Sequence, residues 1–162
     1  MKKMTPRKLV VFVALVVTLC TTVLTPSFAL FDKTRFVTDL GVAFFCFHHF
    51  VYTPYKAGSF TAGAPHRTKA LVKGGVALLF AVNRVKAANK IAHTSKSPWL
   101  HGLAGSLDTM TASFANIGDK LKGGNFHPGD VEGLKGTVDK VGAGAAAGGA
   151  PIKDIEVPVP GG

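Results

Sequence analysis

The chain has 162 residues, with 19 Lys and Arg against 9 Asp and Glu and a formal net charge of +10. A chain of this length can bury an adequate core in a single domain. It contains only 2 cysteines, and the first lies in a segment that we expect to be removed, which excludes the disulfide framework common in small exported domains.

The N-terminus has the order of a secretory signal. A basic start, "MKKMTPRK", precedes the uncharged run "LVVFVALVVTLCTTVL", and "TPSFA" then supplies small residues at Ser27 and Ala29. We predict a signal peptide over 1–29 and a mature chain that begins at Leu30. The apolar run approaches the ~20 residues that span a bilayer, so a retained signal-anchor is the alternative. Loss of the four cations in this segment leaves 15 Lys and Arg against 9 acids, a net charge of +6, and Cys46 becomes the only cysteine.

The mature chain is predicted to be all-α, a small antiparallel bundle of three to four helices. The first helix is expected from about Asp32, a good N-cap, to about Tyr52, with Pro54 ending it. Its apolar stripe consists of Phe36, Leu40, Phe44, Phe47 and Val51.

The second predicted helix follows a long loop. "TPYKAGSFTAGAPHR" is rich in Gly, Pro and Ala and long for a compact domain, so it is a candidate functional surface. The helix is expected from about His66 to about Ala92. Its centre, "GGVALLFAV", is apolar on every side, which is typical of a central helix, and its ends are basic.

The third helix carries the strongest periodic signal. Ser97 is expected to cap it and Pro98 to occupy its first turn. Apolar residues then recur at alternating spacings of three and four, at Leu100, Leu103, Leu107, Met110, Phe114, Ile117 and Leu121. Small residues flank this seam where a dimeric coiled coil would have Glu and Lys, so we expect it to pack within the chain.

The last predicted helix is weaker. It is expected from Asp130, as a cap, through Val141, although Gly133 and Gly136 each cost about 1 kcal/mol relative to Ala inside a helix. The bundle domain is therefore placed at 30–141. Residues 142–162 are rich in Gly, Ala and Pro and are expected to form a flexible tail.

Charge is unevenly distributed along the chain, because no acidic residue occurs between Asp39 and Asp108. The segment 56–96 carries eight cations, which are Lys56, Arg67, Lys69, Lys73, Arg84, Lys86, Lys90 and Lys96. Such a field favours an anionic membrane surface or cell-wall polymer; a solvated basic face is the alternative. Tyr52, Tyr55 and Phe60 are the candidate interfacial aromatics. Aromatics are sparse inside the second helix, so nucleic acid is not an expected partner.

The stretch "FFCFHHF" raises the question of a metal or haem site. On a helix, Cys46 and His49 share a face. In an antiparallel bundle His66 and His127 would lie at the same end, so the four residues are a candidate zinc or copper cluster. No CxxC, HExxH or CxxCH motif is present, and we expect neither a metal nor another cofactor.

No catalytic motif is found in the sequence. Ser106 lacks the second glycine of a nucleophile elbow, no phosphate-binding glycine loop occurs, and Asp39 is expected to pair with Arg35 at the surface. The chain is therefore expected to be a non-catalytic protein, secreted or in the extracytoplasmic cell envelope, that associates with anionic lipid or wall polymer through 56–96. A membrane-active, toxin-like helical protein and a metal-binding secreted protein are the alternatives.

Overall fold

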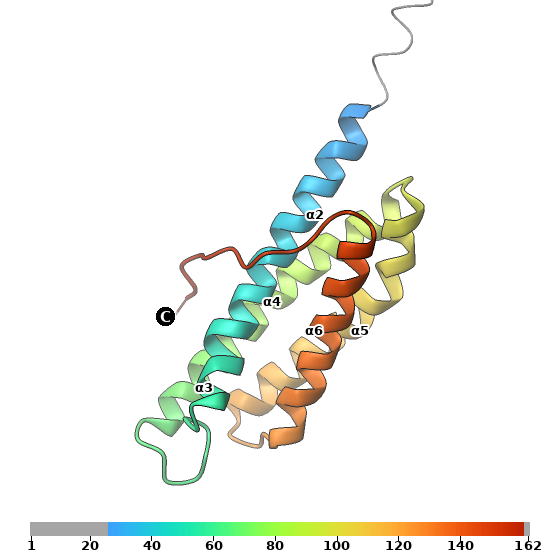
Figure 1. The fold of residues 1–162 in the computed structure, drawn as a ribbon. Helices are drawn as coiled ribbons and strands as arrows, with labels where there is room; N and C mark the ends of the chain where they lie inside the picture. The colour runs from blue at the N-terminus through green and yellow to red at the C-terminus, as the bar shows by residue number, and fades with distance from the viewer. Residues whose placement is uncertain (1–25, 161–162) are drawn as a thin grey trace, which may run out of the picture.

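The computed structural model describes residues 26–160, and within this range the chain is all-helical apart from its loops and its C-terminal segment. Four long helices form an antiparallel bundle (Figure 1): α2 (Pro26–Phe47), α4 (Arg67–Thr94), α5 (Pro98–Lys122) and α6 (Pro128–Ala147). Contacts join α2 to α4, α4 to α5 and α5 to α6. The predicted fold class is confirmed.

The helix α5 follows its sequence prediction closely. It begins at Pro98, directly after Ser97, and every apolar residue of its predicted seam is buried. Its small flanking residues allow close approach to α4: a Cβ at Gly75 would lie 2.7 Å from the carbonyl oxygen of Gly118. The seam therefore packs within the chain, as the small flanks indicated.

The first helix is longer than predicted. It begins at Pro26 rather than near Asp32, and Pro54 does not end it. Instead the helix widens into the π-helical turn η1 (His48–Tyr52) and continues as the short α3 (Thr53–Lys56). Proline cannot donate to the carbonyl four residues earlier, here that of Phe50, and its ring would clash with it. The wide turn separates the two groups.

The carbonyl of Phe50 lies close to a glycine in α4. A Cβ at Gly74 would lie 3.0 Å from that oxygen, which is tighter than ordinary packing. The wide turn and the absence of a side chain at Gly74 are thus two parts of one contact between the first and second helices.

The predicted start of α6 at Asp130 is also wrong. The helix begins at Pro128, and Asp130 lies in its first turn, where the carboxylate accepts a hydrogen bond of 2.9 Å from the backbone N–H of His127. Lys120 at the end of α5 donates to the same carboxylate at 2.8 Å. These bonds lower the pKa of Asp130, with the Lys120 bond the larger cause.

The C-terminal segment differs most from its prediction. The boundary at residue 142 falls inside α6, which continues to Ala147 because its small residues pack closely: a Cβ at Gly142 would lie 3.3 Å from the ring of Phe44. Residues 148–160 then cross to α2 and lie along it (Figure 1). The N–H of Ile155 donates to the carbonyl of Gly41 at 3.0 Å, and Val159 is buried. We call residues 148–160 the C-terminal strap.

Candidate anionic-surface site

The eight cations of 56–96 divide between the two ends of the bundle. Lys56 ends α3, and Lys69 and Lys73 lie in the first two turns of α4, beside the 57–66 loop. Lys86, Lys90 and Lys96 lie towards the opposite end. Lys73 and Lys86, the nearest members of the two groups on α4, are about 20 Å apart along the helix, more than twice the Debye length of ~8 Å, so the two groups act as separate patches.

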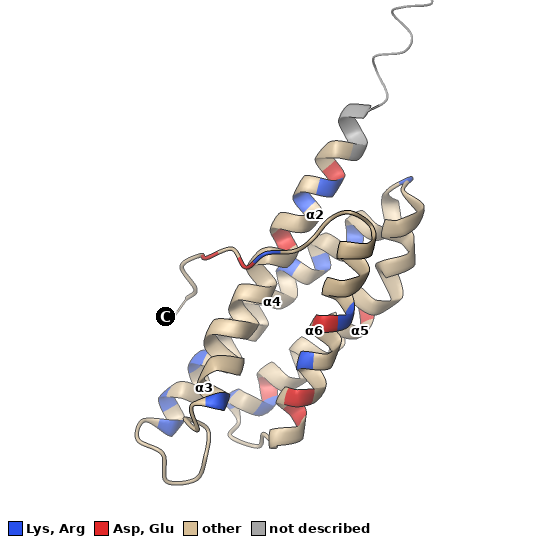
Figure 2. Cartoon of the chain, in the orientation of Figure 1, with Lys and Arg blue, Asp and Glu red and all other residues tan. Residues whose placement is uncertain are grey.

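At the loop end, α3 and the first turns of α4 carry Lys and Arg and no acidic residue, whereas α5 and α6 carry the acidic residues of this end together with Lys120 and Lys122 (Figure 2). Lys56 and Lys69 are exposed, and neither they nor Lys73 lie within ion-pair distance of a carboxylate among the described residues. We call Lys56, Lys69 and Lys73 the loop-end lysines.

Arg84 differs from the other cations of the segment because it has an acidic partner. Its guanidinium Nη1 lies 3.5 Å from Oδ1 of Asp39 and its Cζ lies 5.6 Å from the centre of the Phe80 ring. Asp39 is 6% exposed, so the predicted surface pair with Arg35 is wrong. Arg84 neutralises a buried carboxylate, a role that competes with binding an external anion.

The three candidate aromatics are more buried than an interfacial role requires. Phe60 is 3% exposed and packs edge-to-face with Phe126 at a centroid distance of 5.3 Å. Tyr52 packs against the Phe47 ring at 5.8 Å, and the ammonium of Lys135 lies 5.9 Å from its ring centre. Tyr52 lies at the edge of the bundle core, whereas Phe60 and Tyr55 both line a surface cavity.

The structure separates Cys46, His49, His66 and His127. Cys46 is buried in the core, where burial raises the pKa of its thiol to about 11, while the three histidines are exposed. The face predicted for Cys46 and His49 is lost because the π-helical turn begins between them. Among residues 30–160, no group of three or more His, Cys, Asp and Glu side chains is placed to hold a metal ion.

The histidines of the π-helical turn have other contacts. His49 stacks on Phe45 at a centroid distance of 5.1 Å, whereas Nδ1 of His48 lies 2.8 Å from Oδ2 of Asp154 in the C-terminal strap. The sequence signal for the second contact is weak because 106 residues separate the partners.

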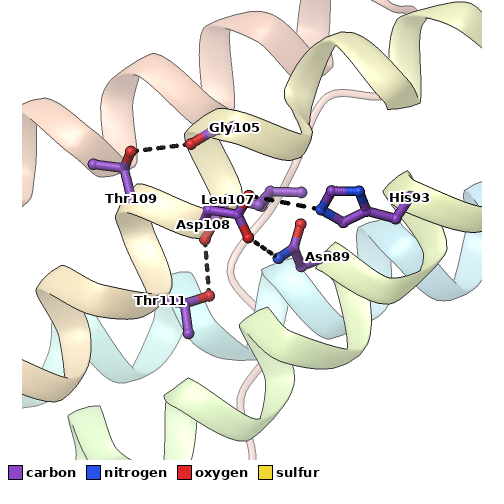
Figure 3. Close-up of polar contacts among 7 residues, drawn as sticks. All are labelled: Asn89, His93, Gly105, Leu107, Asp108, Thr109 and Thr111. Carbon is purple, nitrogen blue, oxygen red and sulfur yellow. Dashed lines mark hydrogen bonds and ion pairs between the residues drawn. The ribbon is translucent and has the colours of Figure 1, made fainter.

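A second polar cluster joins α4 to α5 (Figure 3). Asn89 donates from Nδ2 to Oδ1 of Asp108 at 2.6 Å, and Nε2 of His93 lies 3.6 Å from Oδ2 of the same carboxylate. The nearby hydroxyls of Thr109 and Thr111 donate to carbonyls of their own helix, at Gly105 and Leu107. The contacts of Asp108 with Asn89 and His93 link α4 to α5.

One helical stretch among the described residues, Leu30–Lys56, is long and apolar enough to cross a membrane by length and composition. Its most apolar window is 56% buried inside the bundle, as expected for a core helix. At its start, Leu30 and Phe31 are exposed by 69% and 76%.

Comparison of the chain with protein-family models, with curated proteins and with solved structures found no match.

Proposed function

We propose that this chain is a non-catalytic protein, secreted or held in the extracytoplasmic cell envelope, that associates with anionic lipid or wall polymer through its basic segment. The proposal depends mainly on one observation, which is that the cations of segment 56–96 lack acidic partners. Of the eight cations in 56–96, only Arg84 lies within ion-pair distance of a carboxylate among the described residues. Unpaired cations on one surface attract anionic surfaces in a salt-dependent manner.

The loop end is the patch that we assign to this contact. The loop-end lysines are contributed by α3, which also carries Tyr55, and by α4, and they lie beside the 57–66 loop with its exposed Thr61 and Ala62. Each Lys near an anionic membrane contributes about 1 kcal/mol, so the three together are worth on the order of a hundredfold in partitioning.

The proposal that the protein is exported depends on the N-terminal sequence pattern. Residues 1–25 of this pattern lie outside the residues that the structure describes. N-terminal sequencing of the protein recovered from its native location is expected to start at Leu30. A start at Met1 would favour the retained signal-anchor.

The test compares two matched triple variants. In one, Lys56, Lys69 and Lys73 are replaced by Gln; in the other, Lys86, Lys90 and Lys96 are replaced by Gln, with the same change in net charge. We expect co-sedimentation with vesicles of anionic lipid at low salt to fall strongly in the first variant and modestly in the second. Wild-type binding should weaken in high salt.

Two results would contradict the proposal. Equal binding to vesicles of zwitterionic and anionic lipid, unaffected by salt or by either triple variant, would show that the positive segment is only a solvated face. Release of the vesicle contents on binding would instead favour the membrane-active alternative, in which the apolar stretch Leu30–Lys56 leaves the bundle.

A further inference from the structure

A cavity of about 320 Å³ lies beneath the 57–66 loop, at the end of the bundle that carries the loop-end lysines. Its walls come from four parts of the chain: Tyr55 in α3, Phe60 and Ala62 in the loop, Arg67 at the start of α4, and Phe126 in the connection to α6. Its volume lies at the lower end of the range of small-molecule sites, so it has room for one alkyl chain and not for a diacyl lipid.

One wall of this cavity carries an uncompensated cation. Arg67 is partly buried, and its Nε donates to the carbonyl of Phe60 at 2.9 Å. Neither Nη group has a hydrogen bond or a carboxylate partner among residues 30–160. A partly desolvated guanidinium without a counter-ion is costly, and an oxyanion in the cavity would remove that cost.

The surrounding backbone adds to the positive potential. Arg67 is the first residue of a 28-residue helix whose first turn contains no acidic side chain. The residue before it, His66, has a left-handed backbone (φ 58°) and makes no side-chain cap. Helix N-termini carry partial positive charge, so Arg67 and the end of α4 favour the same sign of ligand.

The remaining walls are mostly apolar, with Thr61 as a polar residue whose hydroxyl donates to the carbonyl of Gly58. Phe60 and Phe126 meet edge-to-face, and Phe60 is held by the core with 3% of its surface exposed. Tyr55 is partly buried and packs against the same core. The cavity thus combines an apolar interior with a single cationic corner, which is the complement of a molecule with an alkyl chain and a terminal oxyanion.

We propose that this cavity binds a single-chain anionic amphiphile, with its carboxylate or phosphate on Arg67 and its alkyl chain against Phe60 and Phe126. This deepens the proposed function, on which it rests for the class of ligand. A free fatty acid and one chain of a membrane lipid share this chemistry, and the experiment separates them.

The probe is octyl phosphate, titrated into the purified chain below its micelle concentration and followed by calorimetry and by the NMR shifts of the Phe60 and Phe126 rings. The comparison probes are octyl trimethylammonium, with a cationic head, and inorganic phosphate, without a chain. We expect octyl phosphate to bind and both comparison probes to bind at least tenfold more weakly. Shifts in the Phe60 and Phe126 signals would place the ligand in the cavity.

Three variants assign the binding to this cavity. Arg67→Gln is expected to weaken octyl phosphate binding about tenfold, and Ala62→Trp, which fills the cavity from the exposed loop, to abolish it. Lys140→Gln, in the second half of α6 and outside the basic segment, removes the same charge and should leave binding unchanged. Circular dichroism checks that each variant folds.

The outcomes separate this proposal from the proposed function. Equal binding of the anionic and cationic amphiphiles, or binding that survives both Arg67→Gln and Ala62→Trp, would overturn it. Wild-type association with anionic vesicles without binding of octyl phosphate would also overturn it, while the proposed function would stand. If Ala62→Trp abolishes both octyl phosphate and vesicle binding, a membrane lipid is the ligand; loss of octyl phosphate binding alone assigns a free amphiphile.

Discussion

The contact of the C-terminal strap with α2 depends on Gly41, and replacing this glycine by alanine tests whether the strap is held in place. An alanine Cβ at this position would lie 2.5 Å from the carbonyl oxygen of Lys153 and 2.8 Å from the side chain of Ile155. The first of these atoms is backbone and belongs to the strap. The strap must therefore move away from α2 to admit the methyl group.

The sign of the effect on stability is decided by two opposing terms. Alanine is favoured over glycine inside a helix by about 1 kcal/mol, so Gly41→Ala would stabilise a chain whose strap makes no contact. Displacement of the strap removes the hydrogen bond from Ile155 to Gly41, worth about 1 kcal/mol, and exposes part of the Ile155 side chain, worth about 1 to 2 kcal/mol. We expect a net loss of about 1 to 2 kcal/mol.

Urea unfolding at neutral pH measures this loss, and trypsin cleavage after Lys153 reports release of the strap. The matched control is Gly136→Ala in α6, where an added Cβ would meet no atom within 4 Å, so that the helix-propensity gain should appear alone. The reasoning would be refuted if Gly41→Ala stabilised the chain as much as Gly136→Ala and left the rate of cleavage unchanged.

Three further predictions concern the core, the thiol and the α6 cap. Phe114→Ala, a fully buried side chain of α5, should cost about 3 to 5 kcal/mol in urea unfolding, whereas Val72→Ala on the exposed side of α4 should change stability by less than about 0.5 kcal/mol. Because burial raises the pKa of Cys46 to about 11, iodoacetamide should label it slowly at pH 8 in the native chain and quickly in urea; its contribution to stability should be lost as pH rises from about 9 to about 11. Asp130→Asn should cost about 1 kcal/mol at pH 7, measured by urea unfolding. Since the Lys120 contact lowers the pKa of Asp130, this difference is present above the ordinary value of 3.8 and should disappear as pH falls through the lowered pKa.

The sequence predicts best those helices whose capping residues and apolar spacing all lie within the helix itself. Ser97, Pro98 and the three-and-four spacing that follows lie within one element, so α5 could be placed almost to the residue. The end of the first helix was predicted wrongly because the effect of Pro54 depends on how the helix packs against α4. Pro54 is accommodated by the π-helical turn before it, and the carbonyl of Phe50 in this turn lies against Gly74 of α4.

The basic residues of the candidate site could be predicted from the sequence, but their ion-pair partners could not. The acid-free segment 56–96 can be read directly, but the pairing of Arg84 with Asp39 joins residues 45 positions apart, so the sequence does not show that Arg84 already has a partner. The strap was missed for the same reason. Gly, Ala and Pro indicate a tail that forms no core of its own, yet its contacts with Gly41 and His48 exist only once α2 has folded beside it.

The π-helical turn His48–Tyr52 has a consequence for how sequences related to this one should be aligned. Such a turn closes its hydrogen bonds over one residue more than an α-helical turn, so it adds one residue to the helix between two fixed ends. A relative that lacks one residue here, and has no proline at the position of Pro54, would keep an ordinary α-helix between the same flanking contacts. A single gap between Phe47 and Thr53 would then mark a change of helix type, with the register of the bundle preserved on both sides.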